Sequence, residues 1–230
     1  MADDFAARVS RLAALAEPAR RALYRFVVEQ PGPVSRDQAA EGVGVARHTA
    51  KFHLDRLVEE GLLRVEFRRL TGRTGPGAGR PTKLYRRAEG EVAVSVPERH
   101  YDLAGQLLAG AIEASAAAGT DVVDALHEAA AEHGRAVAGE LPAGSGASAT
   151  SGAAALEAAR TTLATHGYQP HVEGSELTLT SCPFDALARD HTELVCGMNL
   201  ALLDEVAEAA GLTARLDPAP DRCCVVLAAR

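Results

Sequence analysis

The sequence predicts an α+β protein in two parts: a helical N-terminal part that ends in a β-ribbon, and a longer part that begins with helices and ends with strands. Three observations predict this class. Apolar residues recur at helical spacing through residues 4–60. Two alternating segments, 62–69 and 83–87, flank a glycine-rich stretch and are typical of a hairpin. Alanine-rich helical sequence then begins near residue 99.

The N-terminal part is expected to contain four helices, each with an identifiable start or end signal. Pro18 suits the first turn of the second helix, Ser35 caps the third, and Gly61 ends the fourth. The expected helices cover residues 4–15, 18–29, 36–41 and 46–60. Three of these helices, the two-stranded ribbon and the basic loop between its strands make up a winged helix-turn-helix.

The second part is expected to alternate between helices and strands. Helices are predicted over residues 99–118, 120–140, 153–166 and 184–210, and strands over 169–173, 176–181, 212–216 and 223–228. We therefore divide the chain into a DNA-binding domain (1–90), a helical linker or dimerisation segment (91–140), a flexible loop (141–152) and an α+β sensor domain (153–230).

Charge is distributed unevenly along the 230 residues, although the net charge is only −7. Residues 1–90 hold 17 Lys and Arg against 11 Asp and Glu, whereas residues 91–230 hold 7 against 20. A basic half joined to an acidic half is typical of a nucleic-acid reader fused to a regulatory module. No run of about 18 apolar residues predicts a membrane span, and the acidic N-terminus does not resemble a secretory signal, so we expect a cytoplasmic protein.

The fourth helix and the ribbon carry the residues expected to contact DNA. In a helix-turn-helix the second helix enters the major groove, and the wing can follow the phosphate backbone. Asp55, Glu59 and Glu60 fall at the far end of that helix, away from the expected DNA. The candidate DNA-binding residues are Arg47, His48, Thr49, Lys51 and His53 on the helix, and Arg68, Arg69, Arg73, Arg80 and Lys83 on the wing.

A family resemblance supports this interpretation over about 80 residues. The stretch from Ser35 to Leu63, with the segment Gly79–Tyr85 after it, resembles the winged-helix repressors of the ArsR-like class. The resemblance implies a winged-helix fold and binding to double-stranded operator DNA. Repressors of this kind usually bind two-fold symmetric operators as homodimers. The helix from Leu103 to Ala118 could form the dimer seam or belong to the core.

All four cysteines, Cys182, Cys196, Cys223 and Cys224, lie in the second part. Without a secretory signal we expect a reducing compartment, where thiols are free, catalytic or metal-bound. Thiolates are soft ligands that suit iron–sulfur clusters or zinc. Two other interpretations remain open: a metal-free thiol sensor, and cysteines that only pack as small apolar residues. We expect His191 to be a capping or surface residue rather than a ligand.

The pattern Cys182-Pro183-Phe184, followed by His191, Cys196 and Cys223-Cys224, resembles the C-terminal domain of SufR-type regulators. These proteins repress iron–sulfur assembly operons and sense the cluster itself. The resemblance implies that Cys182, Cys196 and Cys223 are cluster ligands, with Cys224, His191 or an external group as the fourth. The sequence departs from the four-cysteine pattern, because it has no thiol between Cys196 and Cys223.

No catalytic signature is present, so we expect a regulator and not an enzyme. The glycine-rich stretch 72–79 lacks the Lys-Ser/Thr ending of a phosphate-binding loop. The group His127, Glu128, Glu132 and His133 is interpreted as a solvated helix face. The competing function is a winged-helix regulator that senses a small apolar ligand or zinc, with structural cysteines.

Overall fold

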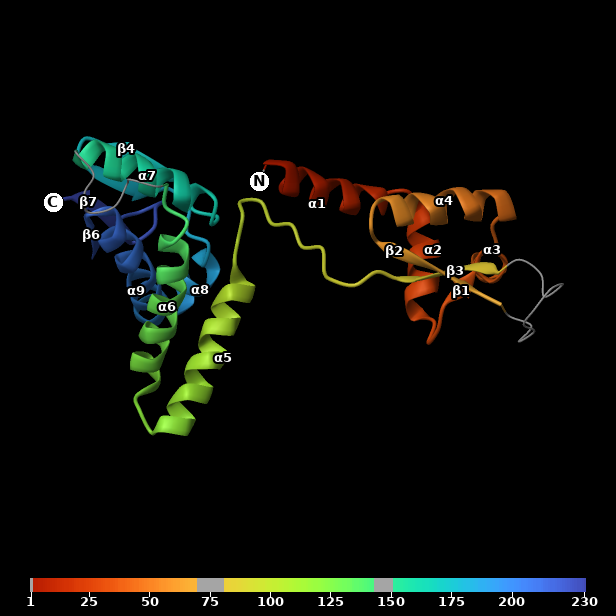
Figure 1. Ribbon diagram of the computed structural model, residues 1–230, viewed down its shortest axis with the longest axis horizontal. Helices are drawn as coiled ribbons and strands as arrows, with labels where there is room; N and C mark the ends of the chain where they lie inside the picture. The colour runs from red at the N-terminus through yellow and green to blue at the C-terminus, as the bar shows by residue number, and fades with distance from the viewer. Residues whose placement is uncertain (1, 70–80, 143–150) are drawn as a thin grey trace. The chain divides into compact units, whose positions relative to one another are not determined.

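The structure is a computed structural model that describes residues 2–69, 81–142 and 151–230. The chain divides into two compact units, Met1–Val94 and Ser95–Arg230, and each is described on its own. Helices and strands occur in both units, which confirms the predicted α+β class (Figure 1). No described helix has the length and apolar character needed to cross a membrane.

The first unit is a helical domain with a small antiparallel sheet, in the strand order β1-β3-β2. We expected only two strands, but Val34 pairs with Tyr85 and adds a short third one. The elements are α1 (Ala2–Ala14), α2 (Pro18–Glu29), β1 (Val34–Ser35), α3 (Arg36–Val43), α4 (Arg47–Glu59), β2 (Leu63–Arg68) and β3 (Thr82–Arg87).

Local capping defines the helix ends of this unit. Ser35 accepts a hydrogen bond from the Gln38 backbone, while the Gln38 side chain accepts one from the Ser35 backbone, so α3 begins with a capping box. Gly44 ends α3 with φ of +73°, a left-handed conformation that glycine adopts without steric cost. This turn directs the chain into α4, and Leu54 of that helix packs in a core with Leu23 of α2.

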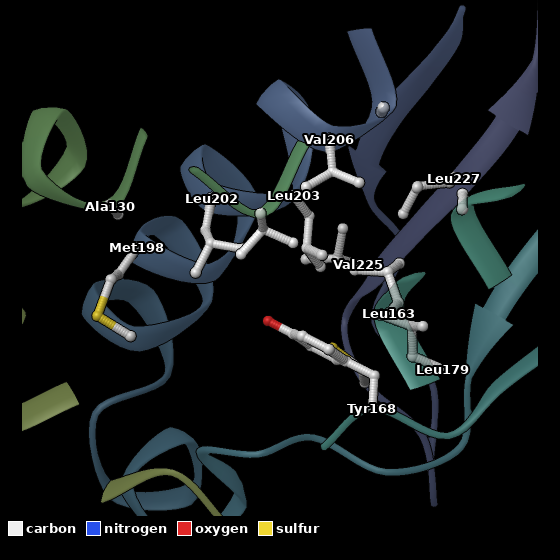
Figure 2. Close-up of a cluster of buried hydrophobic side chains, with 14 of the residues drawn as sticks. Ala130, Leu163, Tyr168, Leu179, Met198, Leu202, Leu203, Val206, Val225 and Leu227 are labelled. Atoms are coloured by element: carbon white, nitrogen blue, oxygen red, sulfur yellow. The ribbon is translucent and has the colours of Figure 1, made fainter. Parts of the chain in front are cut away.

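The second unit packs helices against a four-stranded antiparallel sheet in the order β4-β5-β7-β6. The central helix is α9, which contacts α6 and the sheet strands β6 and β7. Leu203 and Val206 of α9 point into the core against Val225 of β7 (Figure 2). The elements are α5 (Tyr101–Ala118), α6 (Val122–Ala138), α7 (Gly152–Ala164), β4 (Pro170–Glu173), β5 (Glu176–Leu179), α8 (Asp185–Asp190), α9 (Thr192–Ala210), β6 (Leu212–Leu216) and β7 (Val225–Ala229).

Helices α5 and α6 belong to this unit, although the sequence suggested a separate linker or dimerisation segment over 91–140. Helix α6 lies along α9, and α5 lies along α6. The contact between α6 and α9 is close because Gly134 faces the backbone of α9, where a Cβ atom would overlap the carbonyl oxygen of Leu202. Most of the expected flexible loop 141–152 lies outside the described residues.

Candidate nucleic-acid interface and cysteine group

Helix α4 presents one face to the core and the opposite face to solvent. Ala50, Leu54 and Leu57 are fully buried at helical spacing, so the other side of the helix is exposed. Thr49 is half-buried at the edge of this face. The exposed side chains are those of Arg47, His48, Lys51, Phe52 and Arg56. The structure therefore brings three of the five predicted helix residues together on one accessible surface.

His53 is a correction to the predicted DNA-binding set. Its side chain is only 8% exposed, and its Nε2 atom lies 3.5 Å from the carboxylate of Glu17. Position 53 follows Ala50 by three residues and precedes Leu57 by four, so it lies on the buried stripe of the helix. His53 therefore packs on the core side of α4 and is not part of the exposed helix face.

Arg47 is held by an acidic partner at the start of α3. Its Nε atom donates to Asp37 Oδ1 at 2.7 Å, and its second nitrogen donates to the other carboxylate oxygen. This hydrogen bonding from Arg47 keeps the pKa of the Asp37 carboxyl below its usual range. Both side chains are well exposed. A phosphate offers the same pair of acceptor oxygens, so Arg47 can exchange one anion for the other.

Asp55 links the recognition helix to the wing, although we expected it to lie away from the DNA surface. Its carboxylate is 3.2 Å from Lys51 Nζ and 2.5 Å from Lys83 Nζ, and it accepts a hydrogen bond of 2.9 Å from the Tyr85 hydroxyl. Burial acts to raise the pKa of Asp55, but the hydrogen bonds from Lys83, Tyr85 and Lys51 outweigh it and lower the pKa. The acid thus fixes two predicted DNA-binding lysines beside each other.

The wing arginines that the structure describes are exposed along the ribbon. Arg68 pairs with Glu66 of its own strand at 2.8 Å, and Arg69 follows at the strand end. Both remain accessible to a phosphate backbone. Arg73 and Arg80, at the predicted tip of the wing, lie outside the described residues.

Two exposed aromatic residues on this unit were missed by the sequence interpretation. Phe52 on α4 is 66% exposed and Phe67 on β2 is 65% exposed. Phe52 follows Lys51 on the accessible face of the helix, and the edge of its ring contacts His53. The signal was present in the sequence, because position 52 lies off the buried stripe of Ala50, Leu54 and Leu57. An apolar group on a recognition helix can contact the methyl group of thymine.

The cysteine group comprises Cys182, Cys196, Cys223 and Cys224, which come from three separate segments of the second unit. Cys182 follows β5, Cys196 lies on α9, and the neighbouring Cys223 and Cys224 precede β7. A disulfide joins Cys196 to Cys224, with Cα atoms 6.5 Å apart. The sequence had led us to expect free, catalytic or metal-bound thiols and no disulfide. The two free cysteines are Cys182, which is half-buried, and Cys223, which is buried.

The two free thiols share a hydrogen bond. Cys182 donates to the sulfur of Cys223, which raises the pKa of Cys182 and, with burial opposing, lowers the pKa of Cys223. The backbone N–H of Val225 and the side-chain amide of Asn199 also donate to Cys223, the latter at 3.3 Å. Cys223 is therefore the sulfur best prepared to carry a negative charge.

A thiolate-bound group on all four cysteines would require the disulfide to open. Cys223 and Cys224 are neighbours in the chain, so one residue of each sulfur pair comes from the same short segment before β7. Hydrogen bonds to sulfur, such as that from Asn199, are a common feature of iron–sulfur sites. In the oxidised arrangement, no three His, Cys, Asp or Glu side chains of the described residues are placed to hold one metal ion.

The histidines of the second unit also depart from expectation. His127 and His133, interpreted as part of a solvated face, are half-buried, and the Nε2 atom of His127 is buried against α9 beside Gly197. His133 instead lines a cavity together with His100 and His166. His191 is exposed at the junction between α8 and α9.

Comparison with known proteins adds one match. The profile of a family described as a helix-turn-helix domain matches residues 15–66, which span α2 to the greater part of β2. No curated protein and no solved structure gives a significant match to the chain. With its three-helix core, its β-ribbon and its exposed basic helix face, the protein is a DNA-binding transcriptional regulator with an N-terminal winged helix-turn-helix domain.

Proposed function

We propose that the protein is a repressor that binds a two-fold symmetric operator as a homodimer, and that an iron–sulfur cluster on the cysteine group controls this binding. The observation that carries the proposal is that two sulfur pairs, Cys182 with Cys223 and Cys196 with Cys224, come from three chain segments of the second unit and are linked through neighbouring residues 223 and 224.

The DNA-binding part of the proposal is supported by the accessible basic residues of α4 and the wing. Arg47 and Lys51 lie on the exposed helix face, and Asp55 holds Lys83 next to Lys51. Such a row of cations can neutralise successive phosphates. A homodimer would present two copies of this row to two half-sites. Ile112 of α5 is 60% exposed, which supports α5 as a dimer seam.

The regulatory part requires the disulfide to open. Two electrons and two protons from a dithiol reductant convert Cys196–Cys224 to two thiols and leave four thiols in the group. Cys182, Cys196 and Cys223 are then the proposed cluster ligands, with Cys224, His191 or an external group as the fourth. A bound cluster would supply a centre that responds to iron and oxidants. Zinc on the same sulfurs is the alternative occupant.

The first test is the metal content of protein purified without oxygen. Under the proposal, the full-length protein absorbs in the visible range and contains iron and acid-labile sulfide. Operator sites selected from random DNA then bind cluster-loaded and cluster-free protein with affinities that differ at least about tenfold, or about 1.4 kcal/mol. Equal affinity of the two forms would reject cluster control, and a colourless zinc protein would favour the alternative.

A variant separates the sensing role from a structural one. Cys182→Ser should remove iron and the dependence of DNA binding on the cluster, while helix content and cluster-free DNA affinity stay unchanged. Thr180→Ser, two residues away and exposed, is the matched control and should retain iron. If Cys182→Ser retains a full complement of iron, Cys182 is not a ligand.

A further inference from the structure

The second unit contains a cavity of about 230 Å³ that the cysteine proposal does not use. It is lined by the start of α5, the C-terminal half of α6, the segment after α7, the segment just before α8, and α9. Its wall has an apolar part, formed by the buried side chains of Tyr168, Phe184 and Leu202. Its polar part is formed by three imidazoles, those of His100, His133 and His166. We call this cavity the imidazole pocket.

The three imidazoles lie close enough to influence one another. Burial lowers the pKa of His133, and the neighbouring His166 and His100 lower it further, while Glu140 opposes them. His166 contacts the Glu140 carboxylate at 2.9 Å. The Nε2 atom of His100 is buried and has no hydrogen-bond partner among the described residues. The ring rests on Gly167, where a Cβ atom would lie 2.5 Å from Nε2.

The first turn of α5 borders the same pocket. His100 precedes this 18-residue helix, and no side chain caps its start. The N–H groups in the first turn of a helix lack partners within the helix and carry a partial positive charge. Asp102 and Leu103 of this turn line the pocket, so the turn faces the same space as the imidazoles. The helix start therefore favours a negatively charged guest, and the imidazole N–H groups can donate hydrogen bonds to it.

Other charged groups define how much negative charge the pocket can accept. Asp102 is exposed at the mouth, and Glu140 already pairs with His166. Arg99, from the segment before α5, is occupied by Ser181 and by the carbonyl oxygen of Cys182. The imidazoles and the helix start can donate hydrogen bonds to one carboxylate. A second carboxylate would be repelled by Asp102 and Glu140. The three imidazoles are not arranged as ligands of a single metal ion in the described part of the chain.

We propose that the imidazole pocket binds a small organic monocarboxylate with an apolar body. The carboxylate accepts hydrogen bonds from the imidazoles and the first turn of α5, and the apolar body packs on Tyr168, Phe184 and Leu202. Pockets of this kind combine an apolar wall with a few placed polar groups. The inference does not depend on the cysteine proposal, because it rests on the residues of the imidazole pocket and not on the cysteines.

A hydrogen-bond relay connects this pocket to the cysteine group. The Tyr168 hydroxyl donates to Asn199 Oδ1 at 2.5 Å, and Asn199 Nδ2 donates to Cys223 Sγ at 3.3 Å. In Figure 2 the hydroxyl of Tyr168 points away from Leu179 and toward α9. A guest that shifts the Tyr168 ring therefore moves a donor in the surroundings of Cys223.

The test uses full-length protein, with benzoate and 3-methylbutanoate as probes and benzyl alcohol as the neutral comparison for benzoate. Calorimetric titration should show saturable binding of at least one carboxylate, at least about tenfold tighter than benzyl alcohol. His133→Gln should weaken binding at least about tenfold, whereas His171→Gln, whose side chain is 63% exposed on β4, should leave it unchanged. Tenfold corresponds to about 1.4 kcal/mol.

Histidine NMR signals give a second measurement that needs no variant. The carboxylate probe should shift the ring signals of His100, His133 and His166 and leave that of His171 in place. Failure of both carboxylates to bind overturns the proposal. Equal binding of benzyl alcohol, or shifts confined to other histidines, overturns it as well. None of these outcomes bears on iron content, so this proposal and the cysteine proposal can fail separately.

Discussion

The two units of the protein carry their functional groups in different ways. In the first unit these groups lie on adjoining elements, from α4 to β3, and their charged ends are exposed. In the second unit they come from segments as far apart as His100 and Cys224, and most are partly or fully buried. A DNA duplex is large and must be met by an open surface, whereas a cluster or a small molecule must be enclosed. The difference matches the partners proposed for the two units, which are DNA for the first and a cluster or a small molecule for the second.

The largest effect should come from a substitution in the enclosed unit. Gly134→Ala places a Cβ atom against the carbonyl oxygen of Leu202, so α6 and α9 must separate. We expect a loss of about 3 kcal/mol in the free energy of unfolding of the second unit, the upper end for overpacking. Urea titration followed by circular dichroism measures it. Gly110→Ala, on α5 with open space around it, should instead stabilise by roughly 0.5–1 kcal/mol. Equal effects of the two variants would contradict the close α6–α9 packing.

A change on the open surface should leave stability almost intact and weaken DNA binding. Lys51→Gln removes a cation from the exposed face of α4. We expect about tenfold weaker binding to a selected operator, about 1.4 kcal/mol. The slope of log affinity against log salt should fall by about 0.9 for one lost phosphate contact. Fluorescence anisotropy measures both quantities. Arg160→Gln on α7 removes the same charge from the other unit and serves as the control. A similar loss of operator affinity in this variant would mean that the overall charge of the protein, and not a contact by Lys51, sets the affinity.

Phe52 tests whether the open surface reads bases as well as phosphates. If its exposed ring contacts a thymine methyl, replacement of thymine by uracil in the operator should weaken wild-type binding roughly fourfold, since burial of one methyl contributes about 0.8 kcal/mol. Phe52→Ala should bind both operators with equal affinity. Phe5→Ala, an exposed aromatic on α1, should keep the wild-type preference. A persistent preference in Phe52→Ala would assign the methyl contact to another residue.

The smallest effect concerns the acid that joins helix and wing. The folded pKa of Asp55 is lowered, so its contribution to stability is present above its unfolded pKa of about 3.9 and is lost as pH falls through the folded value. The Asp55 side chain is 28% exposed, but its two lysine partners are more open to solvent, so screening keeps the expected contribution to about 1 kcal/mol or less. The difference in unfolding free energy between wild type and Asp55→Asn should therefore shrink between about pH 5 and pH 3. A constant difference would mean that the ion pairs add nothing. Glu29→Gln, at the exposed end of α2, is the control.

The sequence was informative wherever function follows from neighbouring residues. The start of α2 at Pro18, the start of α3 after Ser35 and the exposed basic face of α4 could all be predicted, because caps and helical spacing are local. His53 was misplaced because its polar type was given more weight than its position on the buried stripe. The pairing of Asp55 with Lys83 depends on how the ribbon returns to α4, and no local pattern contains that information.

The second unit could be predicted less well for the same reason. Its cysteines were identified as a group, but their pairing depends on the packing of α9 against β7. The imidazole pocket was not anticipated, since His100, His133 and His166 are more than thirty residues apart and share no motif. His133 was taken for part of a solvated face because residues alone do not show that α5 and the segment after α7 cover it.

The relay from Tyr168 through Asn199 to Cys223 has a consequence for how information is combined. Thermodynamic linkage is reciprocal: if the chemical state of the cysteines alters the affinity of the pocket by some factor, a guest in the pocket alters the equilibrium between those states by the same factor. Under the two proposals, the buried Tyr168 hydroxyl would couple ligand binding in the pocket to the chemical state of the cysteines. Operator binding would then depend on both signals jointly, and neither could be varied without changing the response to the other.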